Sequence, residues 1–196
     1  DNGSGVAAVL SLARAGYSSQ NERTLRFVLF VNEEKPYAHT GQMGSWVYAR
    51  RCRERGEKVT AMLSLETIGY YSDEPGSQRY PPGLGLLYPK TGNFVAFVGN
   101  TRHGQLVRQV VRAFRLNEQF PSQGGAMPHV VSDIGRSDHW PFWQEGYPAL
   151  MVTDTAPFRY PYYHTSEDTV DKIDIERMAR VVRGLQSVIR SLVTIE

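Results

Sequence analysis

The amino-acid sequence predicts an α/β fold built on a mostly parallel sheet. Continuous apolar runs rich in β-branched and aromatic residues alternate with segments whose apolar residues recur at helical spacing. Strands and helices that alternate in this way favour a parallel sheet covered by helices. The 196 residues show no internal repeat and no sign of a second domain, so residues 1–196 are predicted to form a single domain.

Each predicted element rests on its own pattern of apolar residues. Residues 24–32 (TLRFVLFVN) and 59–68 (VTAMLSLETI) are nearly continuous apolar runs, which is typical of buried strands. The last helix is the clearest, because residues 175–192 place one apolar stripe between charged faces. Residues 121–135 are a polar stretch and are not expected to form a strand. In chain order the predicted elements are a helix opening at 3–5, the strand 24–32, a helix over 44–54, the strand 59–68, a strand over 94–98, a helix over 106–114, a short helix from about 137, a strand over 149–152 and the helix 175–192.

The composition is that of an ordinary soluble globular protein, with 41% hydrophobic and 21% charged residues. No run approaches the length of about 18 apolar residues that a membrane span needs. The basic residues are scattered and the net charge is only +2, so we expect no nucleic-acid partner. The single cysteine, Cys52, excludes an internal disulfide and lacks the second cysteine that a redox or zinc-ribbon motif requires.

Acidic and histidine side chains follow the predicted strands, at the sheet edge where ligands and catalytic groups usually lie. Glu33 and Glu34 come directly after one strand, and Glu66 lies near the end of another. His164 ends an aromatic loop that follows the last strand, and Asp1 lies just before the first helix. Carboxylates and an imidazole from separate segments are the ligand set of a zinc-type hydrolytic site. The sequence therefore predicts such a site at this edge.

Each of these residues also has a purely structural explanation. Adjacent glutamates after a strand are commonly solvated, and His164 could simply pack through a hydrogen bond. Glu66 is harder to explain in this way, because an ionised carboxylate inside an apolar run is costly unless it is paired or liganded. Together, at one edge, the residues favour the metal site.

Two other motifs point to different chemistry. Residues 3–8 fit the dinucleotide pattern G-x-G-x-x-A with Glu33 as the ribose-binding acid, but the strand that must precede the pattern is absent and His164 stays unexplained. Residues 137–139 (SDH) contain the residue types of a catalytic triad. Consecutive residues cannot contact one another in the order that a triad needs, and no G-x-S-x-G motif is present. A serine hydrolase is therefore disfavoured.

Short motifs along nearly the whole chain carry a family resemblance. They lie, in order, at residues 1–8 (DNGSGVAA), 30–34 (FVNEE), 43–49 (MGSWVYA), 64–70 (SLETIGY), 137–139 (SDH), 146–149 (GYPA) and 164–169 (HTSEDT). Jointly these motifs resemble the zinc-dependent exopeptidases that include bacterial leucyl aminopeptidases, glutamate carboxypeptidases and glutaminyl cyclases. The resemblance implies a three-layer α/β/α sandwich on a mixed, mostly parallel sheet, here without its N-terminal strands.

The resemblance also implies a role for each site residue. Asp1 would bridge two zinc ions, with the peptide bond that follows it in the cis form. Glu34 and His164 would bind one zinc and Glu66 the other. Glu33 would be the general base. Tyr163 matches a tyrosine that, in some members of the family, hydrogen-bonds the developing oxyanion.

The second zinc of the family takes a histidine from a strand that would precede residue 1, and position 66 is more usually aspartate. The chain opens without an initiator methionine or a signal peptide, so we expect it to be a mature or cut piece of a longer protein. We therefore expect one zinc or none in this chain, against two in the intact site, and little or no activity. We expect a secreted, periplasmic or envelope-associated location for the parent protein.

The implied activity is metal-dependent hydrolysis of N-terminal peptide bonds, with a peptide as substrate. A glutaminyl cyclase is an alternative, as is a non-catalytic receptor-like relative, although the retained Glu33 argues against the latter.

Residues 70–80 and 158–163 are expected to wall a pocket for an apolar or aromatic side chain, or merely to pack the loop down. Arg159 and Tyr160 are predicted substrate-binding residues, Arg159 for a substrate carboxylate. The oligomeric state is left open.

Overall fold

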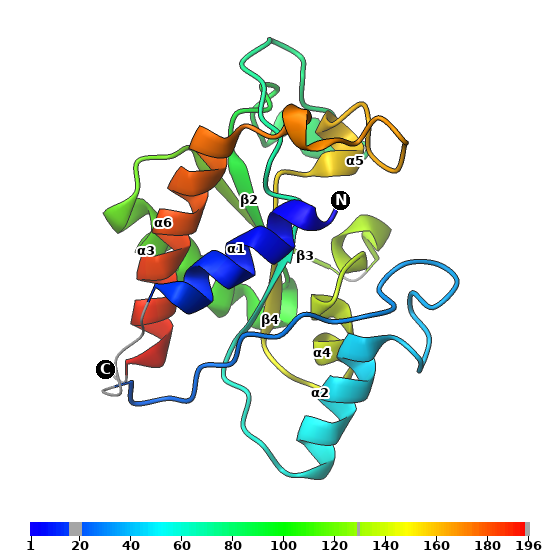
Figure 1. The fold of residues 1–196 in the computed structure, drawn as a ribbon, viewed down its shortest axis with the longest axis vertical. Helices are drawn as coiled ribbons and strands as arrows, with labels where there is room; N and C mark the ends of the chain where they lie inside the picture. Colours follow the sequence, from blue (N-terminus) through cyan, green and yellow to red (C-terminus); the bar gives the residue numbers. More distant parts are fainter. Residues whose placement is uncertain (16–20, 129, 195–196) are drawn as a thin grey trace.

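The computed structural model describes residues 1–15, 21–128 and 130–194, and within them one mixed, mostly parallel sheet forms the centre of the fold (Figure 1). Its strands lie in the order β1-β4-β2-β3. The pairs β1–β4 and β2–β3 are parallel, and β2–β4 is antiparallel. The strands are β1 (Met62–Glu66), β2 (Val95–Asn100), β3 (Ser122–Met127) and β4 (Ala149–Thr153).

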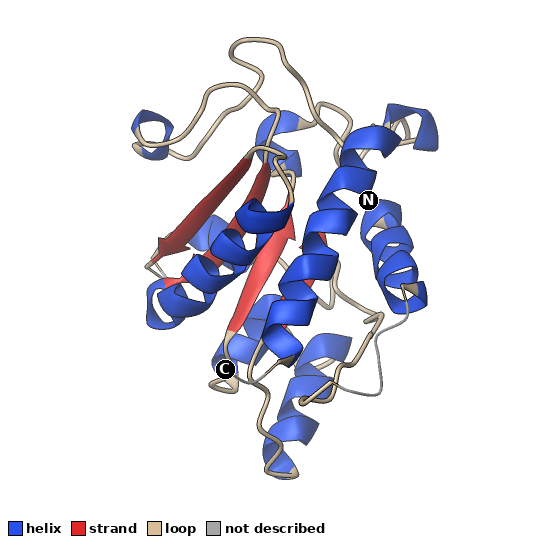
Figure 2. Ribbon diagram, turned by 90° about the vertical axis from the view of Figure 1, so that its left-hand side faces the viewer, coloured by secondary structure: helices blue, strands red, loops and turns tan. Residues whose placement is uncertain are grey.

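Helices cover both faces of the sheet, as a three-layer sandwich requires (Figures 1 and 2). The helices α1, α3 and α6 pack on one face, and α2 and α4 pack on the other. No helix in these ranges is long and apolar enough to cross a membrane. The helices are α1 (Gly3–Arg14), α2 (Gly44–Glu54), α3 (Gly104–Asn117), α4 (His139–Gln144), α5 (Ala156–Arg159) and α6 (Ile175–Val193).

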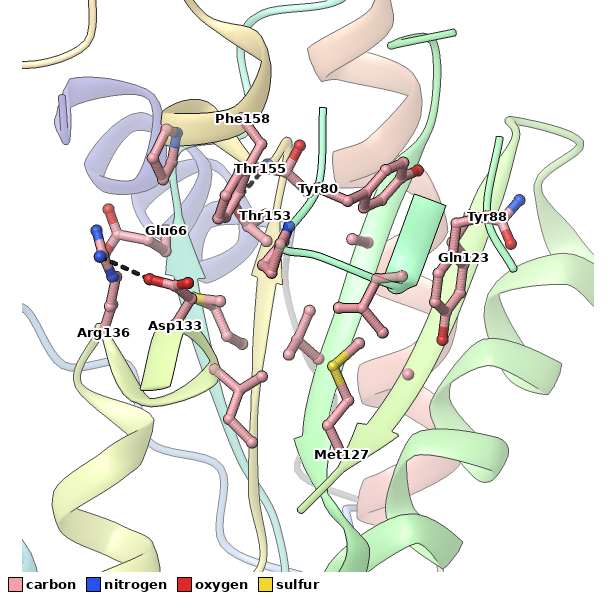
Figure 3. Close-up of a pocket in the computed structure, with 18 of the residues that line it drawn as sticks. Glu66, Tyr80, Tyr88, Gln123, Met127, Asp133, Arg136, Thr153, Thr155 and Phe158 are labelled. Carbon is pink, nitrogen blue, oxygen red and sulfur yellow. Dashed lines mark hydrogen bonds and ion pairs between the residues drawn. The ribbon is translucent and has the colours of Figure 1, made fainter. Parts of the chain in front are cut away.

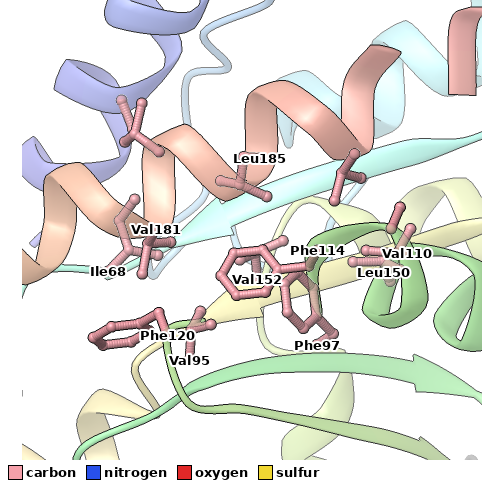
Figure 4. Packing of buried hydrophobic residues seen from close by; sticks show 14 of the residues in the cluster. Ile68, Val95, Phe97, Val110, Phe114, Phe120, Leu150, Val152, Val181 and Leu185 are labelled. Carbon is pink, nitrogen blue, oxygen red and sulfur yellow. The ribbon is translucent and has the colours of Figure 1, made fainter. Parts of the chain in front are cut away.

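The larger core lies between the sheet and the helices α3 and α6 (Figure 4). Phe97 of β2 and Phe114 of α3 meet edge to face, with ring centroids 5.2 Å apart. Val181 and Leu185 of α6 close the layer from above and are fully buried. At Gly184 the two helices approach so closely that a Cβ atom would lie 2.2 Å from Cε2 of Phe114. The helical stripe predicted for residues 175–192 therefore faces this core.

We expect Gly184→Ala to destabilise the fold by about 1–3 kcal/mol, the usual cost of overpacking a core. The loss should exceed the gain of about 1 kcal/mol in helix propensity that alanine brings. Urea denaturation of the wild type and the variant measures the difference. Arg190→Ala, on the exposed side of the same helix, is the control and should change stability by no more than about 0.5 kcal/mol. Equal stability of Gly184→Ala and the wild type would contradict the packing described.

The smaller core lies between the sheet and the helices α2 and α4. Trp143 of α4 donates from its indole to the carbonyl of Ala149 on β4 (2.7 Å). His139, at the start of α4, is fully buried, and its Nε2 lies 2.6 Å from the carbonyl oxygen of Ile134. Burial lowers the pKa of His139 from 6.5 to about 4, so the imidazole is neutral and donates from Nε2.

The lowered pKa of His139 predicts that this residue destabilises the fold in mild acid. The unfolded chain takes up the proton near pH 6.5 but the folded chain only near pH 4, so the contribution of His139 to the free energy of unfolding falls as the pH drops through that window. Between pH 7 and pH 5 this contribution should fall by about 2 kcal/mol. The raised pKa values of Glu33 and Glu66 act in the opposite direction, equally in the wild type and in His139→Gln, so the effect is read as the difference between these two proteins. Denaturant titrations of both at the two pH values measure it, and the same pH dependence in both would refute this origin.

The strand predicted over residues 24–32 is wrong. The segment belongs to no strand in the described structure, and Leu29 and Val31 are 51% and 67% exposed. An apolar run becomes a strand only where a neighbouring strand takes up its backbone hydrogen bonds. Here the carbonyl of Val31 instead accepts from the N–H of Gly44 at the start of α2 (2.9 Å).

Strand β3 lies inside residues 121–135, the polar stretch that was not expected to form a strand. Gly124 and Gly125 remove the apolar alternation by which a strand is recognised. A Cβ atom at Gly124 would lie 2.8 Å from Cγ2 of Val111, so glycine at this position lets α3 pack closely against the strand. Strand β1 is also shorter than the predicted residues 59–68.

Candidate functional site

The turn that opens the chain places Asp1 at the carboxyl end of β1. The side chain of Asn2 donates to the carbonyl of Leu65 (3.1 Å) and accepts from the N–H of Thr67 (3.2 Å). A Cβ atom at Gly5 would lie 2.5 Å from the Leu65 carbonyl oxygen, so only glycine fits there. The Asp1–Asn2 peptide bond is cis, as the family resemblance implies. These contacts explain why the motif at residues 1–8 has asparagine at position 2 and glycine at position 5.

Three predicted ligands, Asp1, Glu34 and His164, meet at this point. The Nε2 atom of His164 lies 2.9 Å from Oδ2 of Asp1 and 3.0 Å from Oε1 of Glu34. One ligand atom from each residue lies within 4.8 Å of the other two. An imidazole nitrogen and two carboxylate oxygens suit a zinc ion, and a catalytic zinc site commonly has three protein ligands. The residues present therefore fit the metal that the resemblance implies.

Asp168 and Tyr160 form a second layer behind Asp1. The backbone nitrogen of Asp1 donates to Asp168, whose Oδ1 accepts from the hydroxyl of Tyr160 (2.8 Å). Tyr160 is 8% exposed and packs against Tyr70, with ring centroids 4.7 Å apart. The prediction that Tyr160 binds substrate is therefore not supported, because its hydroxyl is engaged in positioning Asp1. Asp168 was not predicted, although it lies in the motif 164–169.

We expect Tyr160→Phe to weaken zinc binding about tenfold in the complete protein that carries this chain. Residues behind the ligands typically contribute 10- to 100-fold in metal affinity by orienting them. Competition with a chromophoric zinc chelator measures the affinity. Tyr147→Phe is the matched control, because Tyr147 is also buried and donates its hydroxyl to a carbonyl, that of Glu57 (2.9 Å). Equal affinity in Tyr160→Phe and wild type would exclude the positioning role.

Three further carboxyl groups lie close together beside the ligands. Burial raises the pKa of Glu33 to about 7, helped by the nearby charges of Asp138 and Glu34. Burial and the charge of Glu33 raise the pKa of Glu66 to about 8, and burial raises that of Asp138. A carboxyl group whose pKa lies near neutrality can both accept and return a proton at that pH. Glu33 therefore has the properties that its predicted role as a general base requires.

Glu66 is not part of the three-residue ligand group found among the described residues. Its carboxyl group lies on the wall of a cavity next to the site (Figure 3). The predicted convergence of four metal-binding groups thus holds for three of them. The role of Glu66 as a ligand of a second zinc stays a prediction.

Tyr163 lies against the ligand histidine. Its ring stacks on that of His164, with centroids 3.9 Å apart and planes 20° from parallel. Burial, and then the charges of Glu66, Glu34 and Glu33, raise the pKa of Tyr163 well above its ordinary value. The phenol therefore keeps its proton at neutral pH and can donate a hydrogen bond.

A cavity that is partly open to solvent adjoins the site (Figure 3). Its floor is the sheet, where Ala96, Val98 and Met151 are apolar, and its walls include Tyr80 and Phe158. An apolar cavity beside a site of this kind suits an apolar group of a small ligand. The predicted wall segments 70–80 and 158–163 both contribute, so they do more than pack the loop down.

Arg159 does not line this cavity, which corrects its predicted role in binding a substrate carboxylate. The residue is only 4% exposed. Its guanidinium donates to Oε1 of Gln78 (2.8 Å) and to the carbonyl of Phe94 (2.9 Å), and it lies over the Phe94 ring. Because Gln78 and Phe94 line the cavity, Arg159 supports the wall from behind.

The alternative of a serine hydrolase finds no support at residues 137–139. The hydroxyl of Ser137 lies 2.8 Å from that of Ser64, and His139 is engaged with the carbonyl of Ile134. A triad needs the serine hydroxyl to bond to the histidine ring. Residues 137–139 therefore do not form a catalytic triad.

The chain matches peptidase family M28 over residues 1–189 and therefore belongs to that family. It is 40% identical over 186 residues to the uncharacterized protein YfbL of Escherichia coli, which covers 94% of this chain and 57% of that protein. It is 27% identical over 199 residues to a probable leucine aminopeptidase of Arthroderma benhamiae, covering 95% of this chain and 46% of that protein. The chain thus spans about half the length of the curated relatives it matches.

Solved structures share the fold. BSAP, a zinc aminopeptidase from Bacillus subtilis, is similar with a TM-score of 0.69 and 24% identity, covering 100% of this chain and 42% of that chain. The LapA aminopeptidase of Legionella pneumophila is similar with a TM-score of 0.71 and 20% identity, covering 100% of this chain and 48% of that chain. The predicted α/β fold and its resemblance to zinc exopeptidases are therefore confirmed.

Proposed function

We propose that the protein carrying this chain is a zinc-dependent aminopeptidase that removes N-terminal residues with apolar side chains. The observation that carries the proposal is the convergence of Asp1, Glu34 and His164 next to Glu33 and an apolar cavity. Membership of peptidase family M28 supports it, as do relatives named as probable leucine aminopeptidases. We infer at most one tightly bound zinc for the residues of this chain, since the ligand group has three members.

Glu33 and Glu34 are consecutive but have different neighbours, which separates their roles. Glu34 reaches His164, while Glu33 lies near Glu66 and Asp138. Zinc bound by Asp1, Glu34 and His164 would supply a Lewis acid that polarises the scissile carbonyl and acidifies the attacking water.

Glu33 would accept the proton of that water and pass it to the leaving amine. The hydroxyl of Tyr163 would donate a hydrogen bond where negative charge develops on the carbonyl oxygen. The side chain of the first substrate residue would enter the cavity over Ala96, Val98 and Met151.

A glutaminyl cyclase is the second candidate, because the described ligand group is suited to a single metal ion and lies beside a carboxyl group that can move a proton. The two activities give different products from a peptide that begins with glutamine. Ring closure releases ammonia and leaves the peptide bonds intact, whereas an aminopeptidase releases free glutamine. Mass spectrometry of the products distinguishes them.

We expect Glu33→Gln to lower turnover of an aminoacyl chromogenic substrate by about 100-fold or more while zinc content stays unchanged. The amide keeps the size of the side chain but cannot accept the proton. His164→Ala should lose zinc as well as activity. Kinetics and elemental analysis of the complete protein measure both quantities, and Glu176→Gln, in the first turn of α6, serves as the control. Near-normal turnover in Glu33→Gln would overturn the assignment of the base.

A further inference from the structure

The cavity has a single positively charged residue among those of its lining that the structure describes, Arg136. Its Nη2 lies 2.6 Å from Oδ1 of Asp133, which also lines the cavity. Figure 3 places this ion pair beside Glu66 at one end of the cavity, with Tyr88 and Gln123 at the other. Tyr163 is near enough for the charge of Arg136 to act on its phenol. The cation thus lies at the end of the cavity next to the catalytic groups.

The backbone around Arg136 is held in place. Arg136 follows the short turn Ser132–Gly135, and the ion pair with Asp133 spans that turn. The carbonyl of Gly135 accepts from Nε2 of His39 (2.9 Å), and a Cβ atom at Gly135 would lie 2.7 Å from Cδ1 of Trp140. The turn is therefore packed against its neighbours, and Asp133 limits the directions that the guanidinium can take.

The guanidinium nevertheless has donors to spare. The side chain of Arg136 is 56% exposed, and the contact with Asp133 occupies only Nη2. A guanidinium presents five N–H donors in a planar fork that matches a carboxylate. Arg159, the residue predicted to bind a substrate carboxylate, is buried and engaged elsewhere. Arg136 is the available arginine on the cavity side.

The polarity of the cavity separates the two ends of a short substrate. The apolar floor suits the side chain of the first residue, and it offers no partner for a carboxylate. The second residue of the substrate would then lie outside this floor, near the exposed guanidinium of Arg136. In a dipeptide that residue ends in the α-carboxylate.

We propose that Arg136 binds the α-carboxylate of dipeptides whose first residue is apolar, which makes dipeptides the preferred substrate class. The inference rests on the proposed aminopeptidase function. A longer or C-terminally amidated peptide places a neutral amide where the dipeptide has its charge, and so loses the charge-assisted pair. Arg136 is thus a specificity-determining residue.

The test compares Leu-Gly, Leu-Gly-amide and Leu-Gly-Gly as substrates of the complete, zinc-loaded protein. We expect the wild type to have a KM for Leu-Gly about tenfold below that for Leu-Gly-amide, the loss typical of a hydrogen bond to a charged group. Arg136→Gln should raise the KM for Leu-Gly about tenfold and leave that for the amide within about twofold. Arg136→Lys should fall between them, because lysine keeps the charge but not the fork.

Arg112→Gln, an exposed arginine on α3, is the matched control and should change neither KM. If Arg136→Gln does not fold, Arg136→Lys carries the test. An equal effect of the substitution on dipeptide and amide would overturn the inference while the proposed function stands. So would a wild-type preference for Asp-Leu-amide that Arg136→Gln abolishes, since Arg136 would then bind an acidic first residue. No cleavage of any substrate by the wild type would overturn the proposed function and the inference with it.

Discussion

The crowding of carboxyl groups at the carboxyl end of β1 is the constraint on which the rest of the site depends. Asp1, Glu33, Glu34, Glu66 and Asp138 lie near one another. Burial raises the pKa of Glu33, Glu66 and Asp138, and repulsion from neighbouring carboxylates adds to the rise at Glu33 and Glu66. Like charges removed from water are unfavourable unless a cation balances them. A bound metal ion is the natural counter-charge for this arrangement, and the fold must hold the groups together until it binds.

Hydrogen bonds made behind the site hold these groups in place. The N–H of Asp154 donates to the carbonyl of Thr67 (2.7 Å), and its carboxylate accepts from the N–H groups of Gly69 and Tyr70. This buried aspartate fastens the end of β4 to the end of β1. Asp168 extends the same frame to Asp1. The segments that carry Asp1, Glu66 and His164 are thus joined by hydrogen bonds, which resists the repulsion between the acidic side chains.

The fold was predictable where a single helix face or a buried strand decides the pattern. The apolar stripe of α6 and the run that contains β4 are visible because each packs one continuous face against the core. Residues 24–32 and β3 were not predictable for opposite reasons. The first has the apolar residues of a strand but no neighbouring strand within the described residues, and the second has a neighbour but glycines where apolar side chains are expected. Pairing depends on distant segments, which local composition does not contain.

The same limit separates the ligands from the residues around them. Asp1, Glu34 and His164 follow from residue type and motif order, since only a few side chains can bind zinc. Arginine has no such restriction, and an arginine in an aromatic loop can face substrate or fold inward. Arg159 folds inward because its guanidinium donates to the carbonyl of Phe94 and to the side-chain oxygen of Gln78, both far away in sequence. The guanidinium of Arg136 contacts one carboxylate, that of Asp133, and remains exposed to solvent. The role of an arginine is therefore set by which acceptors the tertiary fold brings to it, and a guanidinium with unused donors beside a cavity is the better candidate for binding.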